Sequence, residues 1–185
     1  LKNKVLKKIN GKYVILLLLE RLSKSKKLND IIVAIPKNKE NDRLNNILLK
    51  NSYKVFRGSE NNVLSRYYEA ALKYKTNVIV RITGDCPLVD PILVDNVIKK
   101  FQHSELDYYS NISPPTFPDG FDVEIFSLSA LRKANFETLL QNDKEHVTKY
   151  ILRNNNFKKD NFFSSQDYSH LRLTLDENED FKLIK

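Results

Sequence analysis

Short apolar runs that alternate with longer amphipathic stretches constrain the fold of this chain more than any other feature. Residues 30–35 (Asp-Ile-Ile-Val-Ala-Ile) and 77–82 (Asn-Val-Ile-Val-Arg-Ile) are nearly continuous apolar runs. Such runs are typical of strands that are buried on both faces of a parallel sheet. Shorter or alternating patterns predict further strands at 55–56, 107–109, 121–126 and 170–175.

Helical periodicity separates these strands along most of the chain. It occupies residues 13–28, 40–50, 62–74, 128–140 and 144–153, another helix opens at Asp90-Pro91, and a short one closes the chain. Residues 154–160 are polar and predict a surface loop. This alternation favours a mostly parallel sheet flanked by helices, so the sequence predicts a single α/β domain over residues 1–185.

The composition fits a globular protein and argues against several other classes. With 185 residues, 41% of them hydrophobic, the chain is long enough to enclose a sizeable core. Cys86 is the one cysteine, which excludes an intrachain disulfide and favours a reducing compartment, so we expect a cytoplasmic protein. The longest apolar run, residues 14–19, is far too short to span a bilayer, and we expect no membrane partner.

The net charge of +8 permits two interpretations. It could indicate an anionic partner such as a nucleotide or a nucleic acid, or a general enrichment in lysine. The lysines are spread over the whole chain and are interrupted by acids, without the dense basic cluster that nucleic-acid binding requires. We therefore favour the second interpretation and expect no nucleic-acid partner.

Polar residues follow three of the predicted strands at the point where each strand ends. These motifs are Arg57-Gly58-Ser59, Thr83-Gly84-Asp85 and Asp176. In open α/β sheets, ligands bind at the carboxyl ends of the strands. A shared ligand would explain why basic, hydroxyl and acidic groups are predicted to meet at one edge of the sheet.

Asp85 and Asp176 are the predicted metal ligands. Mg²⁺ prefers oxygen ligands and is commonly held by one or two carboxylates, with substrate phosphates and water completing its shell. A metal here would neutralise charge on a phosphorylated ligand under attack. The alternative is that Asp85 is a turn acid before Cys86-Pro87 and that Asp176 caps the last helix.

The other basic motif also has two interpretations. Arg57-Gly58-Ser59 could bind phosphate, ribose or base, because glycine allows close backbone approach and the flanking side chains donate hydrogen bonds. The alternative is an ordinary strand-to-helix turn. Arg81 lies inside an apolar strand, and because a buried arginine needs a partner, we expect it to form a structural pair with an acid.

Acidic residues surround a proline-rich loop farther along the chain. Asp119, Asp122 and Glu124 could accept hydrogen bonds from sugar hydroxyls, or they could be turn acids and a solvated strand face. His146 could contact a substrate, although a lone histidine is more often a packing residue. We interpret Cys86 as a small packed residue and not a nucleophile, since no base accompanies it and its acidic neighbour disfavours a thiolate.

Five motifs, in this order along the chain, resemble the spore-coat polysaccharide protein F branch of the cytidylyltransferases. They cover nearly the whole chain: Val55-Phe-Arg-Gly-Ser-Glu-Asn-Asn-Val-Leu-Ser-Arg-Tyr-Tyr68, Val80-Arg-Ile-Thr-Gly-Asp-Cys-Pro-Leu-Val-Asp90, Phe117-Pro-Asp-Gly-Phe-Asp-Val-Glu-Ile-Phe126, Glu145-His-Val-Thr148 and Ser169-His-Leu-Arg-Leu-Thr-Leu-Asp176. That branch is similar to the acylneuraminate and 3-deoxy-manno-octulosonate cytidylyltransferases.

The resemblance implies a Rossmann-like nucleotidyltransferase fold and a reaction. In this reaction CTP and a sugar, commonly a keto-sugar acid, give a CMP-sugar and pyrophosphate, with Mg²⁺ as the metal. The resemblance also implies a role in surface polysaccharide synthesis and a homodimer. Carried over onto this sequence, Lys4 contacts the CTP phosphates, Asp85 and Asp176 hold the metal, and these three are catalytic. The other implied site residues are Arg57, Gly58, Ser59 and Gly84 for the nucleotide, and Pro118, Asp119, Gly120, Asp122, Glu124 and His146 for the sugar.

One departure separates the chain from this family pattern. The family opens with a strand and a phosphate loop, whereas this sequence begins inside that segment at Leu1-Lys-Asn-Lys4 and contains no Met. The resemblance therefore implies that the first strand and phosphate loop are missing. Two other functions remain: a nucleotide-sugar-dependent glycosyltransferase, disfavoured because Asp85-Cys86-Pro87 lacks an Asp-x-Asp motif, and an inactive nucleotide-binding fragment.

Overall fold

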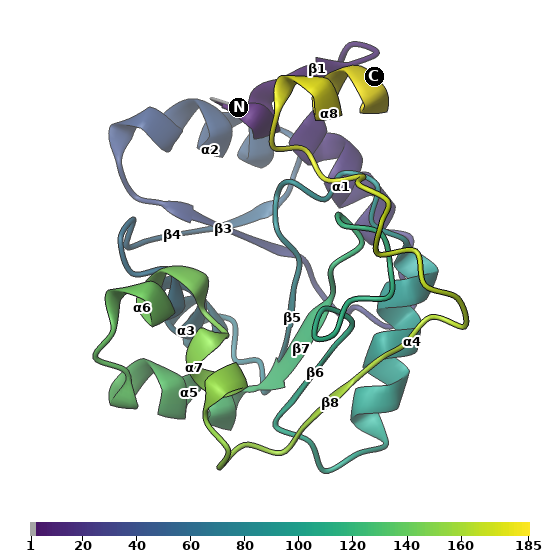
Figure 1. Cartoon of the computed structure of the whole chain (residues 1–185). Coiled ribbons are helices and arrows are strands. Elements are labelled where there is room, and N and C mark those ends of the chain that lie inside the picture. The colour runs from purple at the N-terminus through teal and green to yellow at the C-terminus, as the bar shows by residue number, and fades with distance from the viewer. Residues whose placement is uncertain (1–2) are drawn as a thin grey trace.

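A parallel pair of strands and a separate four-stranded sheet form the framework of residues 3–185, the part of the chain that the computed structural model describes (Figure 1). The pair consists of β3 (Ile32–Pro36) and β4 (Lys54–Gly58). The larger sheet has the order β5-β7-β6-β8, with β5 at Val78–Arg81, β6 at Tyr108–Ser110, β7 at Glu124–Ser127 and β8 at Lys159–Asn161. A small antiparallel hairpin precedes them, with β1 at Lys8–Ile9 and β2 at Lys12–Tyr13.

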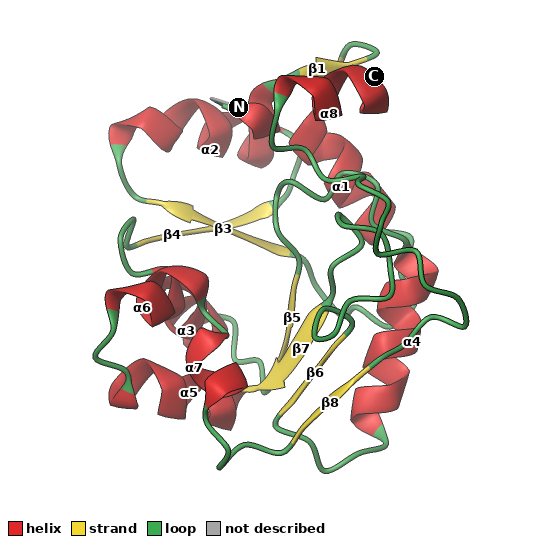
Figure 2. Ribbon diagram, viewed as in Figure 1, coloured by secondary structure: helices red, strands yellow, loops and turns green. Residues whose placement is uncertain are grey.

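Helices surround the strands (Figure 2). They are α1 (Val14–Leu22), α2 (Asp42–Lys50), α3 (Val63–Lys73), α4 (Pro91–Gln102), α5 (Leu128–Glu137), α6 (Gln141–His146), α7 (Lys149–Arg153) and α8 (Asn178–Ile184), with the 3-10 turns η1 (Lys4–Leu6) and η2 (Lys39–Asn41). Within residues 3–185, none of the helices is long and apolar enough to cross a membrane.

Side-chain caps fix the starts of four helices, α3, α4, α5 and α8. Asp90 accepts a hydrogen bond from the backbone of the first turn of α4, with Pro91 at the first helical position, as the sequence predicts. At the other end of the chain, Glu177 and Asp180 form a capping box on α8. Glu177 is therefore the cap, and the alternative that Asp176 caps this helix is wrong.

The larger sheet is mixed, which corrects the prediction of a mostly parallel sheet. β7 pairs antiparallel with both β5 and β6, whereas β3–β4 and β6–β8 are parallel pairs. Parallel neighbours need a crossover connection, usually a helix. Residues 111–123, which join β6 to β7, contain no helix, so the chain reverses direction there. The apolar pattern identifies the strands but carries no information about their direction.

Besides the helix predicted at residues 144–153, which is divided between α6 and α7, three segments differ from the predicted elements. The first helix ends at Leu22 instead of reaching residue 28, because the backbone N–H groups of Lys26 and Lys27 donate to Asp95 on α4. The end of the predicted loop 154–160 enters β8, which lies beside β6.

The third difference concerns residues 170–175, which are extended but do not form a strand. Asp119 and Arg172 are linked by an isolated bridge. The N–H of Leu173 donates to the carbonyl of Asp119 at 2.7 Å, and the N–H of Asp119 donates to the carbonyl of Leu171 at 3.0 Å. The backbone of residues 170–175 therefore pairs with an irregular loop. This loop offers too few successive N–H and C=O groups for a ladder of hydrogen bonds.

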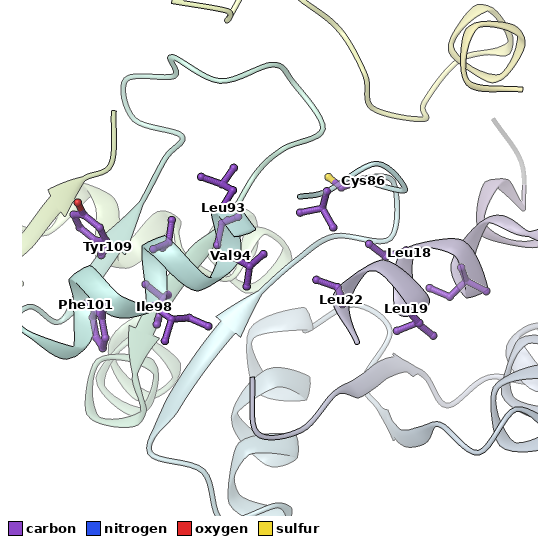
Figure 3. Close-up of a cluster of buried hydrophobic side chains, with 14 of the residues drawn as sticks. Leu18, Leu19, Leu22, Cys86, Leu93, Val94, Ile98, Phe101 and Tyr109 are labelled. Atoms are coloured by element: carbon purple, nitrogen blue, oxygen red, sulfur yellow. The ribbon is translucent and has the colours of Figure 1, made fainter. Parts of the chain in front are cut away.

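The main hydrophobic core joins α1 and α4 to the sheet (Figure 3). Its buried residues include Leu18, Leu19 and Leu22 on α1, Leu93, Val94, Ile98 and Phe101 on α4, Tyr109 on β6, and Cys86. Cys86 is 1% exposed, and burial raises the pKa of its thiol to about 12. The prediction that this cysteine is a packed residue is confirmed.

A buried ion pair joins β5 to β7. Arg81 and Glu124 stand opposite each other in the register of the two strands and form a salt bridge. Glu124, 1% exposed, also accepts hydrogen bonds from the Tyr108 hydroxyl at 2.8 Å and the Thr148 hydroxyl at 2.7 Å. The predicted structural partner of Arg81 is therefore confirmed as Glu124.

We predict that Glu124→Ala lowers the free energy of unfolding by about 3–5 kcal/mol, because it leaves the Arg81 guanidinium buried without its partner. The measurement is urea unfolding at neutral pH. Glu105→Ala is the matched control, since Glu105 is 92% exposed in its side chain and pairs with Lys158 at 3.4 Å; it should change stability by at most about 0.5 kcal/mol. Equal unfolding midpoints for the two variants would contradict the prediction.

Candidate active site

One lysine joins the two aspartates that the sequence predicts as metal ligands. The Lys4 ammonium, in η1, lies 2.7 Å from Oδ2 of Asp85 and 2.6 Å from Oδ1 of Asp176. These residues come from the start, the middle and the end of the chain, and all three side chains are partly exposed. The structure therefore brings Lys4, Asp85 and Asp176 together at one point, which we call the Lys4 cluster.

The backbone holds the two aspartates close to each other. Asp85 follows the end of β5, and its carbonyl accepts hydrogen bonds from the N–H of Leu175 at 2.8 Å and from the Thr174 hydroxyl at 3.1 Å. The Thr83 hydroxyl donates to the Asp85 carboxylate. Since residues 174–175 are tied to the end of β5, the next residue, Asp176, lies beside Asp85.

Gly84 has a packing reason to be a glycine. A Cβ atom at this position would lie 3.1 Å from Cγ1 of Val5, which is closer than ordinary van der Waals contact. Val5 is the neighbour of Lys4 in η1. A side chain at residue 84 would therefore press on the turn that carries the lysine of the cluster.

The charges in the Lys4 cluster stabilise one another. Burial alone would lower the pKa of Lys4, but hydrogen bonds and charges from Asp176 and Asp85 outweigh it, so the pKa is raised. Burial alone would raise the pKa of Asp85, but the hydrogen bonds from Lys4 and Thr83 outweigh it, so the pKa is lowered. Near neutral pH the cluster therefore contains an ammonium and an ionised Asp85.

A second cation connects this cluster to the proline-rich loop. The Arg172 guanidinium contacts Asp119 at 2.8 Å, Asp180 at 3.0 Å and Asp176 at 3.3 Å. Gly120, in the same loop, has φ +100°, and a Cβ there would lie 2.6 Å from the backbone of Leu173. The loop 118–122 is therefore fixed against residues 172–174 and lies beside the Lys4 cluster.

Asp122, in the proline-rich loop, has a raised pKa. Burial, followed by the charges of Asp119, Glu124 and Asp85, raises its pKa to about 6. Asp119 has a raised pKa for a similar reason, with burial as the largest cause. A carboxyl group with a pKa near 6 can both accept and release a proton close to neutral pH.

The structure uses the Arg57-Gly58-Ser59 motif differently. Arg57 contacts the carbonyl of Asn38 and the carboxylate of Asp42, each at 2.7 Å. A Cβ at Gly58 would lie 2.8 Å from Cγ of Arg66 on α3. The backbone N–H of Asn62, just before α3, donates a hydrogen bond to the Ser59 hydroxyl at 3.1 Å. These contacts match the alternative of a strand-to-helix turn.

Two predicted sugar ligands, Glu124 and His146, lie in surroundings other than the Lys4 cluster. Glu124 is buried, and three neighbouring side chains donate to its carboxylate, so it is a core residue here and not a candidate sugar ligand. His146 is exposed at the end of α6, which packs against α3 on the side of the fold far from the N-terminal turn (Figure 1).

Two residues of the site, Arg172 and Thr174, were not predicted from the sequence. The alternation in residues 170–175 contained a usable signal, because a period of two places Arg172, Thr174 and Asp176 on the same side of an extended segment. Thr83 belongs to the predicted Thr83-Gly84-Asp85 motif, and in the structure its hydroxyl donates to the Asp85 carboxylate.

The protein ligands available for a metal are two carboxylates. Within residues 3–185, no cluster of three or more His, Cys, Asp or Glu side chains could hold a metal ion. Asp85 and Asp176 nevertheless converge on a single cation, the Lys4 ammonium. Two hard oxygen donors fit Mg²⁺, which usually takes one or two carboxylates and completes its shell with phosphates and water.

We predict that Asp122→Asn raises the free energy of unfolding relative to the unsubstituted protein, and that this gain is larger at pH 7.5 than at pH 4.5. Between the unfolded pKa near 4 and the folded pKa of about 6 the native state binds the extra proton, so the free energy of unfolding falls as pH rises. The variant removes this loss, which we expect to be roughly 2 kcal/mol. Chemical unfolding at both pH values measures the difference, and a gap between the two proteins that is independent of pH would contradict the assignment.

Comparison with known proteins agrees with this fold. The family model described as cytidylyltransferase matches residues 1–184. The uncharacterized protein MJ1063 of Methanocaldococcus jannaschii is 41% identical, over 99% of this chain and 75% of its own length. The spore coat polysaccharide biosynthesis protein SpsF of Bacillus subtilis is 30% identical, over 100% of this chain and 79% of its own length.

Solved structures give the same result for the fold. A cytidylyltransferase from Leptospira borgpetersenii superposes with a TM-score of 0.95 at 34% identity, covering 100% of this chain and 79% of that one. A CMP:2-keto-3-deoxy-manno-octonic acid synthetase complexed with CTP superposes with a TM-score of 0.68 at 13% identity, covering 89% and 84%, which shows a common fold. The predicted nucleotidyltransferase fold is confirmed, and the chain belongs to the cytidylyltransferase family.

Proposed function

We propose that the Lys4 cluster is the centre of a reaction that joins CTP to a sugar hydroxyl and gives a CMP-sugar and pyrophosphate. The observation that carries this proposal is the meeting of Lys4, Asp85 and Asp176 at the carboxyl end of β5. Ligands of open α/β sheets bind at this end of the strands. Membership of the cytidylyltransferase family supplies the reaction type.

The reaction needs charge neutralisation at the α-phosphorus. The sugar oxygen forms a bond to this phosphorus while the bond to the bridging oxygen breaks, and pyrophosphate leaves. Asp85 and Asp176 would hold Mg²⁺, which when bound supplies a positive charge beside the phosphates. Lys4 then donates its ammonium hydrogen bonds to phosphate oxygens in place of one or both carboxylates.

The proline-rich loop is the proposed sugar side of the site. Pro118, Asp119, Gly120 and Asp122 lie in a segment that Arg172 and the backbone of Leu173 hold beside the Lys4 cluster. Asp122, whose pKa is about 6, is suited to accept the proton that the attacking hydroxyl releases. Arg57, Ser59 and Gly84 remain proposed nucleotide contacts, and His146 a proposed sugar contact that requires movement of α6.

The printed names of relatives suggest the wider setting. A spore coat polysaccharide protein and a 2-keto-3-deoxy-manno-octonic acid synthetase support a keto-sugar acid as acceptor and a role in surface polysaccharide synthesis. The single buried cysteine supports a cytoplasmic location. Exposed Phe136 and Leu139, the latter 88% exposed, support a homodimer whose interface includes the α5–α6 connection.

We predict a selective rise in melting temperature with CTP and Mg²⁺ together. A ligand that binds the native state alone stabilises it by mass action, by about 2.7 kcal/mol at a hundredfold excess over Kd. Thermal unfolding is measured with CTP, UTP, GTP or ATP, each with and without Mg²⁺. Equal shifts with all four nucleotides would contradict CTP selection, and no shift with any of them would favour the alternative of an inactive fragment.

We predict that Asp85→Asn lowers the rate of pyrophosphate release by about 10²-fold or more, since it removes a charge that acts on the transition state. Asp160→Asn is the matched control, because Asp160 is an exposed acid on β8. The Asp160→Asn variant should release pyrophosphate at the same rate as the unsubstituted protein. Unchanged activity in Asp85→Asn would remove the proposed role. Turnover of a nucleotide-sugar donor without pyrophosphate would instead favour a glycosyltransferase.

A further inference from the structure

Arg172 is the side chain that connects the two proposed halves of the candidate site. Its Nη1 donates to Oδ2 of Asp119 in the proline-rich loop at 2.8 Å, and its Nη2 donates to Oδ2 of Asp176 in the Lys4 cluster at 3.3 Å. The guanidinium also binds both carboxylate oxygens of Asp180, through Nε at 3.0 Å and Nη2 at 3.1 Å. One cation therefore holds three carboxylates, which belong to the loop, to the cluster and to α8.

Asp180 fixes the place of this guanidinium. It is buried, and its Oδ2 accepts hydrogen bonds from the backbone N–H groups of Asp176 and Glu177, each at 2.8 Å. The helix that carries it, α8, lies beside the N-terminal hairpin (Figure 1), and Phe181 of this helix packs against the buried cluster that includes Ile9. Asp180 is therefore anchored to the backbone and to the fold, and it presents its carboxylate at a constant position.

Arg172 and Asp180, which we call the clamp, set the orientation of the Asp176 carboxylate. Oδ1 of Asp176 lies 2.6 Å from the Lys4 ammonium, whereas Oδ2 contacts Arg172. Asp180 accepts the backbone N–H of the same residue, so the main chain and the side chain of Asp176 are both held. The clamp therefore directs Oδ1 towards the cation that Asp85 also contacts, at 2.7 Å.

The clamp contains more acids than a structural ion pair requires. The side chain of Arg172 is 48% exposed, and exposed ion pairs contribute little to stability. One buried carboxylate is enough for an arginine of this exposure, as the pair of Arg153 with Asp143 illustrates, in which the arginine side chain is 49% exposed. Three carboxylates around one guanidinium repel one another. Such an arrangement is costly for a stabilising contact but is typical of groups that orient ligand-binding side chains.

We propose that the clamp positions the candidate site: Arg172, held by Asp180, orients Asp176 for a divalent cation and keeps Asp119 of the proline-rich loop at a set place beside it. This inference rests on the proposed function, because the cation belongs to that reaction. Arg172 and Asp180 act through Asp176 and Asp119, so both are positioning residues. Side chains that orient metal ligands commonly affect metal affinity and activity strongly.

The clamp also couples the two halves of the site to each other. Because Asp119 and Asp176 share the guanidinium of Arg172, a displacement of either carboxylate acts on the other. The main chain reinforces this link, since the N–H of Asp119 donates to the carbonyl of Leu171 at 3.0 Å and the N–H of Leu173 donates to the carbonyl of Asp119 at 2.7 Å. A sugar bound at the proline-rich loop is thereby kept in register with the metal ligands.

The test measures the binding of Mn²⁺ alone, through the loss of the electron paramagnetic resonance signal of the free ion. Mn²⁺ takes the same oxygen ligands as Mg²⁺. Arg172→Lys retains the charge but loses the planar fork that reaches Asp180 and Asp119 together. We expect Arg172→Lys and Asp180→Asn each to weaken Mn²⁺ binding by about 10- to 100-fold. The urea midpoint of Arg172→Lys should stay close to that of the unsubstituted protein, because a charge alone satisfies a structural role.

Arg153→Lys is the matched control. Arg153 has nearly the same exposure as Arg172 and also pairs with a buried aspartate, Asp143, but it belongs to α7. This variant should bind Mn²⁺ with unchanged affinity. Pyrophosphate release gives a second reading: Arg172→Lys should need about 10- to 100-fold more Mg²⁺ than the unsubstituted protein to reach half of its maximal rate.

Two results would overturn the inference, and they separate it from the proposed function. If the unsubstituted protein binds Mn²⁺ and the folded Arg172→Lys and Asp180→Asn variants bind it equally well, Asp176 does not need the clamp, and the inference alone is wrong. If the unsubstituted protein binds Mn²⁺ neither alone nor with CTP, the proposed metal site is wrong. The clamp is then an ion pair that serves only the packing of α8.

Discussion

The pairing of Arg81 with Glu124 is the interaction on which the rest of the structure depends. It joins opposite positions of β5 and β7 in a buried environment, and the Tyr108 and Thr148 hydroxyls complete the shell around the carboxylate. Because the pair fixes β7 beside β5, it also holds the segment before β7 next to the segment after β5. Those two segments are the proline-rich loop and the Thr83–Asp85 turn, the two halves of the candidate site.

The candidate site concentrates negative charge in a protein that is positive as a whole. Asp85, Asp119, Asp176 and Asp180 share two cations, Lys4 and Arg172, although the chain has a net charge of +8. Asp122 lies within reach of the charges of Asp119 and Asp85. Burial is the largest cause of the raised pKa of Asp122, and the negative charges of its neighbours raise it further. An arrangement of this kind lowers the stability of the fold, but it allows the site to hold a cation and to move a proton, as functional sites commonly do.

The sequence predicted which residues meet better than it predicted how the strands run. Asp85 and Asp176 could be paired because each follows an extended apolar segment and ligands gather at such ends. The direction of β7 could not be predicted, since the alternation in residues 121–126 is the same in either direction. The same alternation made Glu124 look exposed, and its burial depends on Arg81, a residue more than forty positions away. Lys4 entered only through the family resemblance, because its approach to Asp85 is a long-range contact without a local signal.

β5 links the cavity of about 640 Å³ between the two sheets to the candidate site, because the same strand borders both. Val78 and Val80 line this cavity, while the segment after β5 carries Thr83 and Asp85 and accepts the hydrogen bonds from Thr174 and Leu175. Within residues 3–185 the strand pairs with β7 alone, so it can open locally at its other edge, and such opening would move Asp85 relative to Asp176. The geometry of the Lys4 cluster therefore depends on how firmly the sheet holds β5.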